Sequence, residues 1–207
     1  MPKIMPSAAQ ISASPSHATP GSKEWKIDKF LSTWFTYGYL AAGQVAPFAE
    51  HLHKPMQMAL RSGDSELVAV GLAEALKRLT RVPRPDTHKP TSFPSGHTTA
   101  AFAMATAESQ FNPGSALYWY LGATAISISR IRLYRHHITD VLAGAALGFL
   151  ATRWELSQPR GLLLGGLIVN RTSALGLAAS EWNQSSPEGW SVISGPLGIG
   201  MRYSAKF

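Results

Sequence analysis

Ser95, Gly96 and His97 stand together in the short stretch FPSGHTTAA, which runs over residues 93–101. Pro94 and Gly96 flank the serine in a turn, and small helix-tolerant residues follow the histidine, so a helix is expected to begin here. The N–H groups at the start of a helix favour an anion, and a glycine leaves the backbone open to close approach. An imidazole in this position is typical of a site that binds an anion and moves a proton.

Positive charge is concentrated in two short windows, residues 77–89 and 130–135. The formal net charge is +7, and eight of the nineteen Lys and Arg residues lie in these windows. They are Lys77, Arg78, Arg81, Arg84, Lys89, Arg130, Arg132 and Arg135. Such concentration suits a focused anion site better than a broad basic face, so no nucleic-acid partner is expected.

The candidate residues follow a three-part pattern. The sequence reads K-x6-R-P from Lys77, P-S-G-H from Pro94 and S-R-x5-H-x3-D from Ser129. This order and spacing resemble the signature of the type 2 phosphatidic acid phosphatase superfamily, which includes bacterial acid phosphatases, lipid phosphate phosphatases and vanadium haloperoxidases. The resemblance covers about residues 64–154, and the eight residues between Pro85 and Pro94 are a short connection for the family.

The resemblance implies that a phosphomonoester is hydrolysed by two histidines. His136 would attack phosphorus and form a phosphohistidine, and His97 would protonate the leaving oxygen. Asp140 lies one helical turn after His136 and would accept a hydrogen bond from its Nδ1–H. The phosphate ligands would be Lys77, Arg84, Ser95, Gly96 and Arg130. No metal or other cofactor is expected, because the cations supply the charge, and vanadate is expected to bind as a phosphate analogue.

The charged residues of the site are also expected to affect the pKa values of the two histidines. Asp140 is expected to raise the pKa of His136, while the three cations oppose protonation of both imidazoles in the empty enzyme. His137 has the wrong spacing for the site and is expected to face away. Taken one at a time, these residues have plainer explanations: helix caps, solvated helix ends and an ordinary i,i+4 pair. The ordered set with all three spacings is what favours a phosphate site.

The elements that hold these residues are predicted to be helices. The first covers residues 34–51 and must bend or end at Pro47, and the second covers 64–79 with Asp64 as its N-cap. The apolar face of the second is expected to consist of Leu67, Val70, Leu72, Ala75 and Leu79. Further helices are predicted over 97–110, 115–133 and 138–154.

We therefore expect an all-α helical bundle core of the type 2 phosphatidic acid phosphatase kind over residues 25–157. Residues 1–24 are rich in Ser, Pro and Ala and are expected to form a disordered tail. Residues 158–207 are Gly-rich and end in a strict alternation of apolar and other residues, which predicts a β-containing appendage that packs on the helical domain.

The composition of the sequence limits both the chemistry and the cellular location of the protein. The absence of cysteine excludes disulfides, thiolate nucleophiles and Cys-ligated metals. No run of eighteen apolar residues occurs, so no spanning helix is expected. We expect export to a bacterial periplasm or cell envelope, with the signal peptide lying outside this sequence.

Several functions remain open at this point. The chain could hydrolyse small phosphomonoesters, or lipid-borne phosphate during peripheral contact with a membrane. A vanadate-dependent haloperoxidase is an alternative, although the modest length speaks against it. A non-catalytic envelope module that retains the fold is another, but the intact His97, His136 and Asp140 argue against it.

Overall fold

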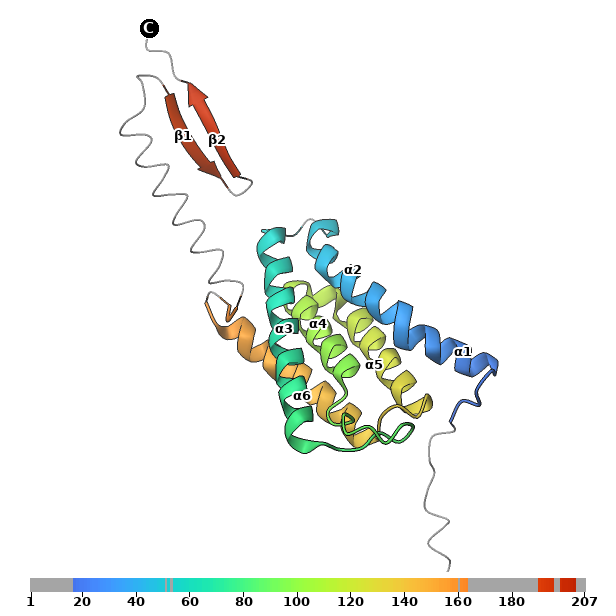
Figure 1. Ribbon diagram of the computed structural model, residues 1–207. Coiled ribbons are helices and arrows are strands. Elements are labelled where there is room, and N and C mark those ends of the chain that lie inside the picture. Colours follow the sequence, from blue (N-terminus) through green and yellow to red (C-terminus); the bar gives the residue numbers. More distant parts are fainter. Residues whose placement is uncertain are drawn as a thin grey trace, which may run out of the picture. The chain divides into compact units, whose positions relative to one another are not determined.

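The computed structural model describes residues 17–50, 52, 54–159 and 161–163, together with the backbone of residues 190–195 and 198–203. The chain divides after Gln158 into two units. The first unit is built from helices (Figure 1). They are α1 (Lys23–Phe30), the π-helical η2 (Leu31–Phe35), α2 (Thr36–Ala49), α3 (Pro55–Thr80), α4 (Gly96–Phe111), the 3₁₀ turn η3 (Pro113–Ser115), α5 (Ala116–Arg132) and α6 (Ile138–Ser157).

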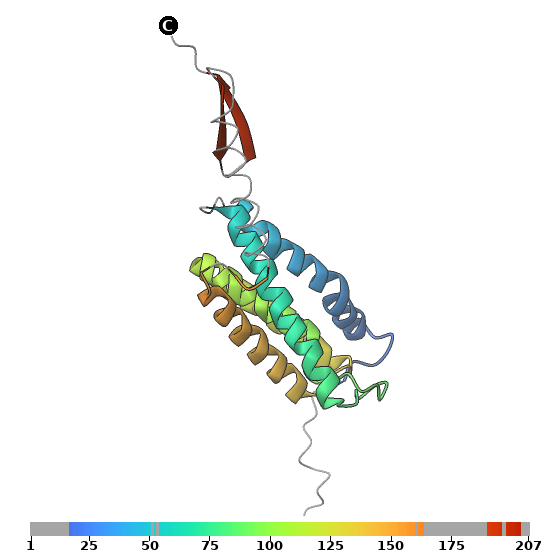
Figure 2. The same cartoon turned by 60° about the vertical axis from the view of Figure 1, so that its left-hand side comes forward.

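Helix α4 is the central element of this bundle, as Figures 1 and 2 show, and it contacts α2, α3, α5 and α6. Its buried positions are almost all Ala, Ser or Thr, with Met104 and Glu108 as the larger exceptions. The threonine hydroxyls donate to acceptors in the helix or at its N-cap; Thr106, for example, donates to the Phe102 carbonyl at 2.7 Å, and Thr99 donates to the Ser95 carbonyl at 3.0 Å. Small side chains of this kind let neighbouring helices pack closely against all sides of α4.

Glycines bring α6 directly against the backbone of α4. A Cβ on Gly148 would lie 2.4 Å from the Thr99 carbonyl oxygen, and one on Gly144 would lie 2.7 Å from that of Ser95. Both distances are too short for real atoms, so only glycine allows this approach. Because α6 begins directly after His137, the two glycines also fix where the start of α6 lies relative to the start of α4.

The face of α3 that is buried in the bundle is not the apolar face that the periodicity of the sequence predicts. Leu67 and Leu79 are 54% and 79% exposed, and Leu72 is also exposed. The buried residues of α3 are Ser62, Asp64, Ser65, Ala69, Ala73 and Lys77. The predicted apolar face is therefore wrong, because the close approach of α4 and α6 selects small and hydrogen-bonding side chains and leaves the large apolar ones outside.

The start of α3 also differs from the prediction. The helix begins at Pro55, whose ring is favourable in a first turn, and it is preceded by Lys54 in a left-handed conformation. Asp64 is thus not an N-cap but a buried residue inside the helix. In contrast, α2 ends at Ala49, two residues after Pro47, which agrees with a helix that ends near this proline.

Buried polar side chains pair with one another between α3, α4 and α6. Ser62 donates to Glu108 at 2.7 Å, and Ser65 donates to Glu155 at 2.6 Å. Arg61 forms an ion pair with Glu155 at 3.0 Å. Burial raises the pKa of Glu108 to about 7, so in the folded protein this carboxyl is mostly protonated below about pH 7 and mostly ionised above it.

The second unit contains two strands, β1 (Trp190–Gly195) and β2 (Gly198–Tyr203), which pair antiparallel with Trp190 opposite Tyr203. They are all that the structure describes after residue 163, so the β-containing appendage over 158–207 stays a prediction. Residues 1–16 of the expected tail lie outside the described residues, and α1 begins two residues before the boundary expected at residue 25. Among the described helices, none combines the length and the apolar character needed to span a membrane.

Candidate active site

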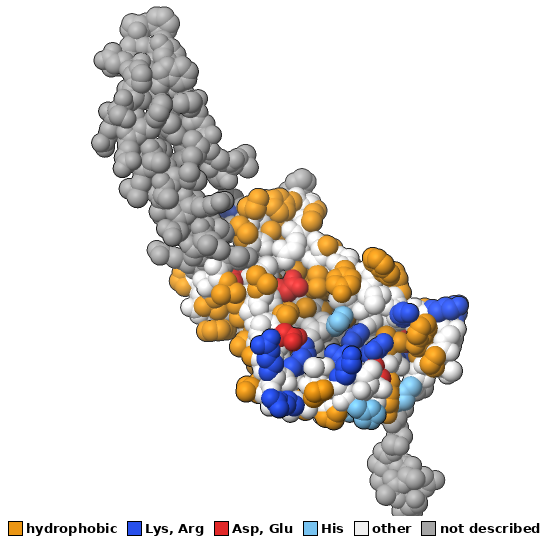
Figure 3. All heavy atoms as spheres, in the orientation of Figure 1, with side chains coloured by type: hydrophobic (Ala, Val, Ile, Leu, Met, Phe, Trp, Pro, Cys, Tyr) orange, Lys and Arg blue, Asp and Glu red, His pale blue; other side chains and the backbone are white. Residues whose placement is uncertain are grey.

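The three parts of the sequence pattern meet where α3 ends, α4 begins and α5 passes to α6. Lys77 lies in the last turn of α3, and Arg130 lies in the last turn of α5. Ser95 is the N-cap residue of α4, and its N–H donates to the Asp140 carbonyl at 2.9 Å. In Figure 3, Lys and Arg side chains gather on the molecular surface around a histidine side chain. The predicted residues thus share one end of the bundle.

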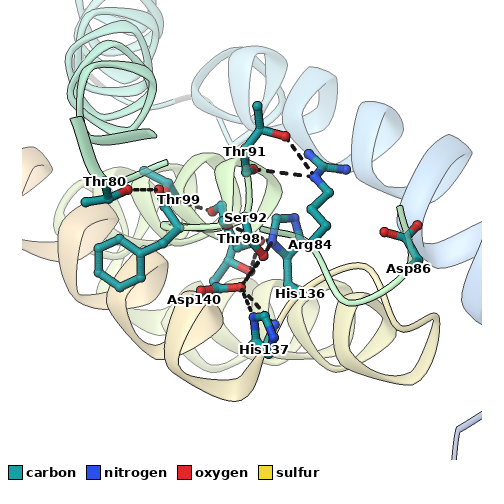
Figure 4. A network of polar contacts seen from close by, with 12 residues as sticks. Thr80, Arg84, Asp86, Thr91, Ser92, Thr98, Thr99, His136, His137 and Asp140 are labelled. Atoms are coloured by element: carbon teal, nitrogen blue, oxygen red, sulfur yellow. Dashed lines mark hydrogen bonds and ion pairs between the residues drawn. The ribbon is translucent and has the colours of Figure 1, made fainter. Parts of the chain in front are cut away.

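The imidazole of His136 is oriented by a main-chain carbonyl. Its Nδ1 lies 2.9 Å from the Ser92 carbonyl oxygen and 3.7 Å from Oδ2 of Asp140 (Figure 4). Because a carbonyl oxygen only accepts, Nδ1 carries the proton, and Nε2 is left as the basic nitrogen. The expected direct bond from Nδ1–H to Asp140 is therefore replaced by a bond to Ser92.

Asp140 instead organises the groups around this histidine. Its carboxylate accepts from the Ser92 hydroxyl and, at 2.8 Å, from the main-chain N–H of His137 (Figure 4). The second bond belongs to the capping box that starts α6. Nδ1 of His137 lies 3.2 Å from the same carboxylate, so the expectation that His137 faces away is wrong. His137 is nevertheless 47% exposed, whereas the side chains of His136 and Asp140 are each 1% exposed.

Lys77 reaches the start of α4. A Cβ on Gly96 would lie 2.9 Å from its Nζ, so the ammonium group lies directly beside the glycine. Lys77 is buried, and it forms an ion pair with Glu74, one turn earlier on α3. The absence of a side chain at Gly96 is what makes room for the ammonium group.

The two arginines are held by neutral groups. Arg84 donates from Nε to the Thr91 hydroxyl at 3.1 Å, within the loop between α3 and α4 (Figure 4). Arg130 is buried and donates from Nη1 to the hydroxyl of Ser32 in η2. Burial, together with Arg84 and Arg135, lowers the pKa of Arg130 to about 10. The guanidinium still carries its charge at neutral pH, and a bound anion would offset the repulsion between the arginines.

Both candidate catalytic histidines are neutral in the empty site. Burial, followed by the charges of Arg130, Lys77 and Arg84, lowers the pKa of His97 to about 4. Burial, followed by Arg130 and Arg84, lowers the pKa of His136 to about 3, against the opposing effect of Asp140. The expected opposition from the cations is present. The net rise in the pKa of His136 that Asp140 was expected to cause is absent, because burial and the arginines outweigh one carboxylate.

Ser95 is more deeply buried than an N-cap residue at a solvent-exposed helix end would be. It is fully buried, its hydroxyl accepts from the Thr98 hydroxyl at 3.1 Å, and it makes no side-chain capping bond to α4. The N–H groups of Gly96 and His97 are in the first turn of α4, where no earlier helical carbonyl can accept from them. These main-chain groups are therefore better placed than the Ser95 hydroxyl to meet an anion that approaches from solvent.

A family model of the PAP2 superfamily matches residues 58–162. The chain belongs to this superfamily. A stretch of 72 residues is 49% identical to a lipid A 1-phosphatase of Porphyromonas gingivalis and covers 32% of this chain and 16% of that protein. The chain thus spans about one sixth of the length of this relative.

The fold of the chain is also similar to that of a solved structure. The crystal structure of Aquifex aeolicus LpxE aligns with a TM-score of 0.54 at 25% sequence identity, over 64% of this chain and 87% of that one. This similarity supports the mostly helical bundle that the sequence resemblance implies.

A cavity of about 420 Å³ adjoins the PAP2 histidine motif on the side of the α5–α6 loop. It is lined in part by Tyr134, His136, His137 and His17. His17 packs edge-on against Tyr134, with 4.2 Å between ring centroids, and the N–H of Ala18 donates to the Arg132 carbonyl at 3.1 Å. Residues 17 and 18, predicted as part of a disordered tail, thus contact this loop.

Metal ligands do not gather in this site. Within the described part of the chain, no group of three or more His, Cys, Asp or Glu side chains is placed to hold a metal ion. Whether the reaction proceeds without a metal stays a prediction.

Sequence reasoning missed several residues that contact the predicted set, among them Ser32, Glu74 and Ser92. Glu74 could have been found, because an acid three residues before a lysine in a helix is a standard ion-pair spacing. Ser92 lies just before the P-S-G-H turn, but only the fold reveals that its main-chain carbonyl meets an imidazole 44 residues away. Ser32 lies in a π-helical turn that no sequence pattern predicted.

Proposed function

We propose that this chain is a phosphomonoester hydrolase that acts on lipid-borne phosphate through His136. The observation that carries the proposal is the orientation of His136: the Ser92 carbonyl accepts from Nδ1–H, which leaves Nε2 unprotonated, and the charges of Arg130 and Arg84 help to keep the imidazole neutral. A neutral imidazole with one fixed nitrogen is prepared for nucleophilic attack. The PAP2 membership of the chain supports the same activity.

In the proposed reaction, Nε2 of His136 attacks phosphorus and the bond from phosphorus to the ester oxygen breaks. Lys77, Arg84 and Arg130, together with the N–H groups at the start of α4, stabilise charge on the phosphoryl oxygens. His97 gives its proton to the departing oxygen, and a phosphohistidine remains. Water then attacks phosphorus and passes its proton to His97 as the N–P bond breaks, which releases phosphate and restores both histidines.

His97 must gain a proton before it can act as an acid. Its pKa of about 4 in the empty site means that it is neutral at pH 7. A phosphomonoester has a second pKa of about 6, so its monoanion carries the required proton into the site. Bound phosphate also offsets the cations that oppose the imidazolium. Binding of the monoanion therefore supplies both the proton and the charge that stabilises it on His97.

A lipid substrate is supported by the surface of the bundle. Large apolar side chains are exposed on α2, α5 and α6, including Tyr37, Tyr118, Leu142 and Leu150, each at least 62% exposed. Exposed apolar surface of this extent is typical of proteins that contact membranes or other proteins. The similar proteins are a lipid A 1-phosphatase and LpxE, and these names support lipid-borne phosphate in a bacterial envelope as the substrate and location.

The test is a comparison of substrates at matched phosphate concentration. Wild type and His136→Ala are assayed for phosphate release from a phosphorylated glycolipid in mixed micelles and from nitrophenyl phosphate, each with and without a chelator. We expect the wild type to prefer the lipid by kcat/KM, to be unaffected by the chelator and to be inhibited by vanadate. A preference for the soluble ester would reject the lipid assignment. Chelator-dependent loss that a divalent ion restores would reject the metal-free mechanism.

A further inference from the structure

Glu74 brings a carboxylate to the place where the proposed reaction needs phosphate. Its Oε1 would lie 3.8 Å from a Cβ on Gly96, while Nζ of Lys77 would lie 2.9 Å from the same point. Both members of the Glu74–Lys77 ion pair thus reach the start of α4. A helix N-terminus beside an ammonium group attracts anions, and in the empty protein the nearby anion is Glu74.

The burial of the two side chains distinguishes this pair from an ordinary ion pair on a helix surface. The side chain of Lys77 is 9% exposed and that of Glu74 is 53% exposed. The ammonium group therefore belongs to the interior of the site, whereas the carboxylate borders solvent. The other two proposed phosphate-binding cations, Arg84 and Arg130, hydrogen-bond to the hydroxyls of Thr91 and Ser32, which do not compensate charge.

We propose that Glu74 is an internal competitor of phosphate: its carboxylate holds Lys77 in the empty protein, and the substrate phosphate must displace it. The proposal rests on the proposed function, because it concerns the same phosphate site. It assigns to Glu74 a role in setting affinity and none in bond making. The same competition favours release of the product, since the carboxylate returns to Lys77 as inorganic phosphate leaves.

Removing the charge of Glu74 should therefore tighten phosphate binding. An ion pair with one exposed partner contributes little, and its loss as a competitor corresponds to a roughly two- to fivefold lower Kd. The difference should shrink at about 1 M salt, where charges are screened beyond about 3 Å. A Glu74 that bound the substrate, or that held Lys77 in its active position, would give the opposite sign.

The experiment is calorimetric titration of inorganic phosphate into wild type, Glu74→Gln and Glu74→Asp. The matched control is Glu50→Gln, which removes the same charge where Glu50 bonds Asn112, just beyond the far end of α4. The 16 residues of α4 place that end about 24 Å from Gly96. Unfolding midpoints check that each variant is folded.

We expect Glu74→Gln to bind phosphate roughly two- to fivefold more tightly than wild type, Glu74→Asp to lie between them, and Glu50→Gln to match wild type. KM for a phosphomonoester should fall by the same factor. If wild type binds phosphate and Glu74→Gln binds it equally or more weakly, the competitor proposal is overturned and the phosphate site stands. If no variant binds phosphate, the phosphate site itself is refuted and the competitor proposal with it.

Discussion

The Ser92 carbonyl oxygen lies 2.9 Å from Nδ1 of His136, closer than the carboxylate of Asp140 at 3.7 Å. The imidazole is thus fixed in one tautomer by the main chain of the loop that precedes α4. Asp140 holds that loop in place through the Ser92 hydroxyl and caps α6 through the N–H of His137. The Ser92 carbonyl therefore orients the imidazole, and Asp140 positions Ser92.

This division predicts a moderate effect of Asp140→Asn. The asparagine can still accept from Ser92 and His137, and the Ser92 carbonyl still selects the tautomer. We expect kcat for an activated ester to fall by about 10- to 100-fold, the loss of a charged contact. A triad histidine that loses its orienting carboxylate loses roughly 10⁴-fold. Steady-state kinetics measure kcat for wild type, Asp140→Asn and His136→Ala. If Asp140→Asn were as inactive as His136→Ala, Asp140 would be the group that orients the imidazole.

The contact between α4 and α6 predicts a steric effect at Gly148. A methyl group there would meet the Thr99 carbonyl, so Gly148→Ala should lower the free energy of unfolding by about 1–3 kcal/mol. Gly71→Ala on α3 is the matched control, because nothing lies within 4 Å of its Cβ position. That substitution should be neutral or stabilise by up to about 1 kcal/mol, since alanine favours a helix. Urea titrations measure both, and equal effects of the two substitutions would contradict the close packing.

These two helices also show how far the sequence predicts the structure. Motif spacing was sufficient to predict that Lys77 lies beside Gly96 and that His136 lies near Asp140, because the chemistry restricts those residue types. The interior of α3 could not be predicted from apolar periodicity, since that periodicity assumes that large apolar side chains are buried. Here the glycines of α6 bring the helices so close that Ala69 and Ala73 fill the interface and Leu79 remains outside. The hydrogen bond from His136 to Ser92 could not be predicted from the sequence. Its acceptor is a main-chain carbonyl, which every residue type carries.

The protonated state of Glu108 predicts how stability depends on pH. Its pKa is raised to about 7 in the folded protein from about 4.5 in the unfolded chain, so the folded state holds the proton more tightly. The associated stability is fully present below about pH 4.5 and is lost as pH rises through about 7, by up to about 3 kcal/mol. Glu108→Gln removes this dependence.

Denaturant titrations at pH 5 and pH 8 measure the effect. Glu108→Gln should match wild type at pH 5 and exceed it by about 1–3 kcal/mol at pH 8. Comparison of the two proteins at each pH cancels the contribution of the buried histidines, which acts in the opposite direction below about pH 6.5. A constant difference between the proteins at both pH values would mean that Glu108 is ionised throughout.

The acid role of His97 predicts a dependence on the leaving group. A nitrophenolate departs without a proton more readily than an alkoxide, so His97→Ala should lose about 10²–10⁴-fold with an alkyl ester and much less with a nitrophenyl ester. In wild type, turnover should have an acidic to neutral optimum and fall at alkaline pH. With the activated ester, this alkaline fall should disappear in His97→Ala. Equal losses for both esters, or an unchanged alkaline limb, would assign the proton to another group.

The central claim is that His136 takes the phosphoryl group, and rapid quenching tests it most directly. Wild type is mixed with a ³²P-labelled activated ester, quenched in alkali, where phosphohistidine survives, and digested for peptide mapping. We expect one labelled peptide, which contains His136, with at most one phosphoryl group per chain and none in His136→Ala. Turnover by wild type with no labelled protein at any quench time, or label on another residue, would contradict the account.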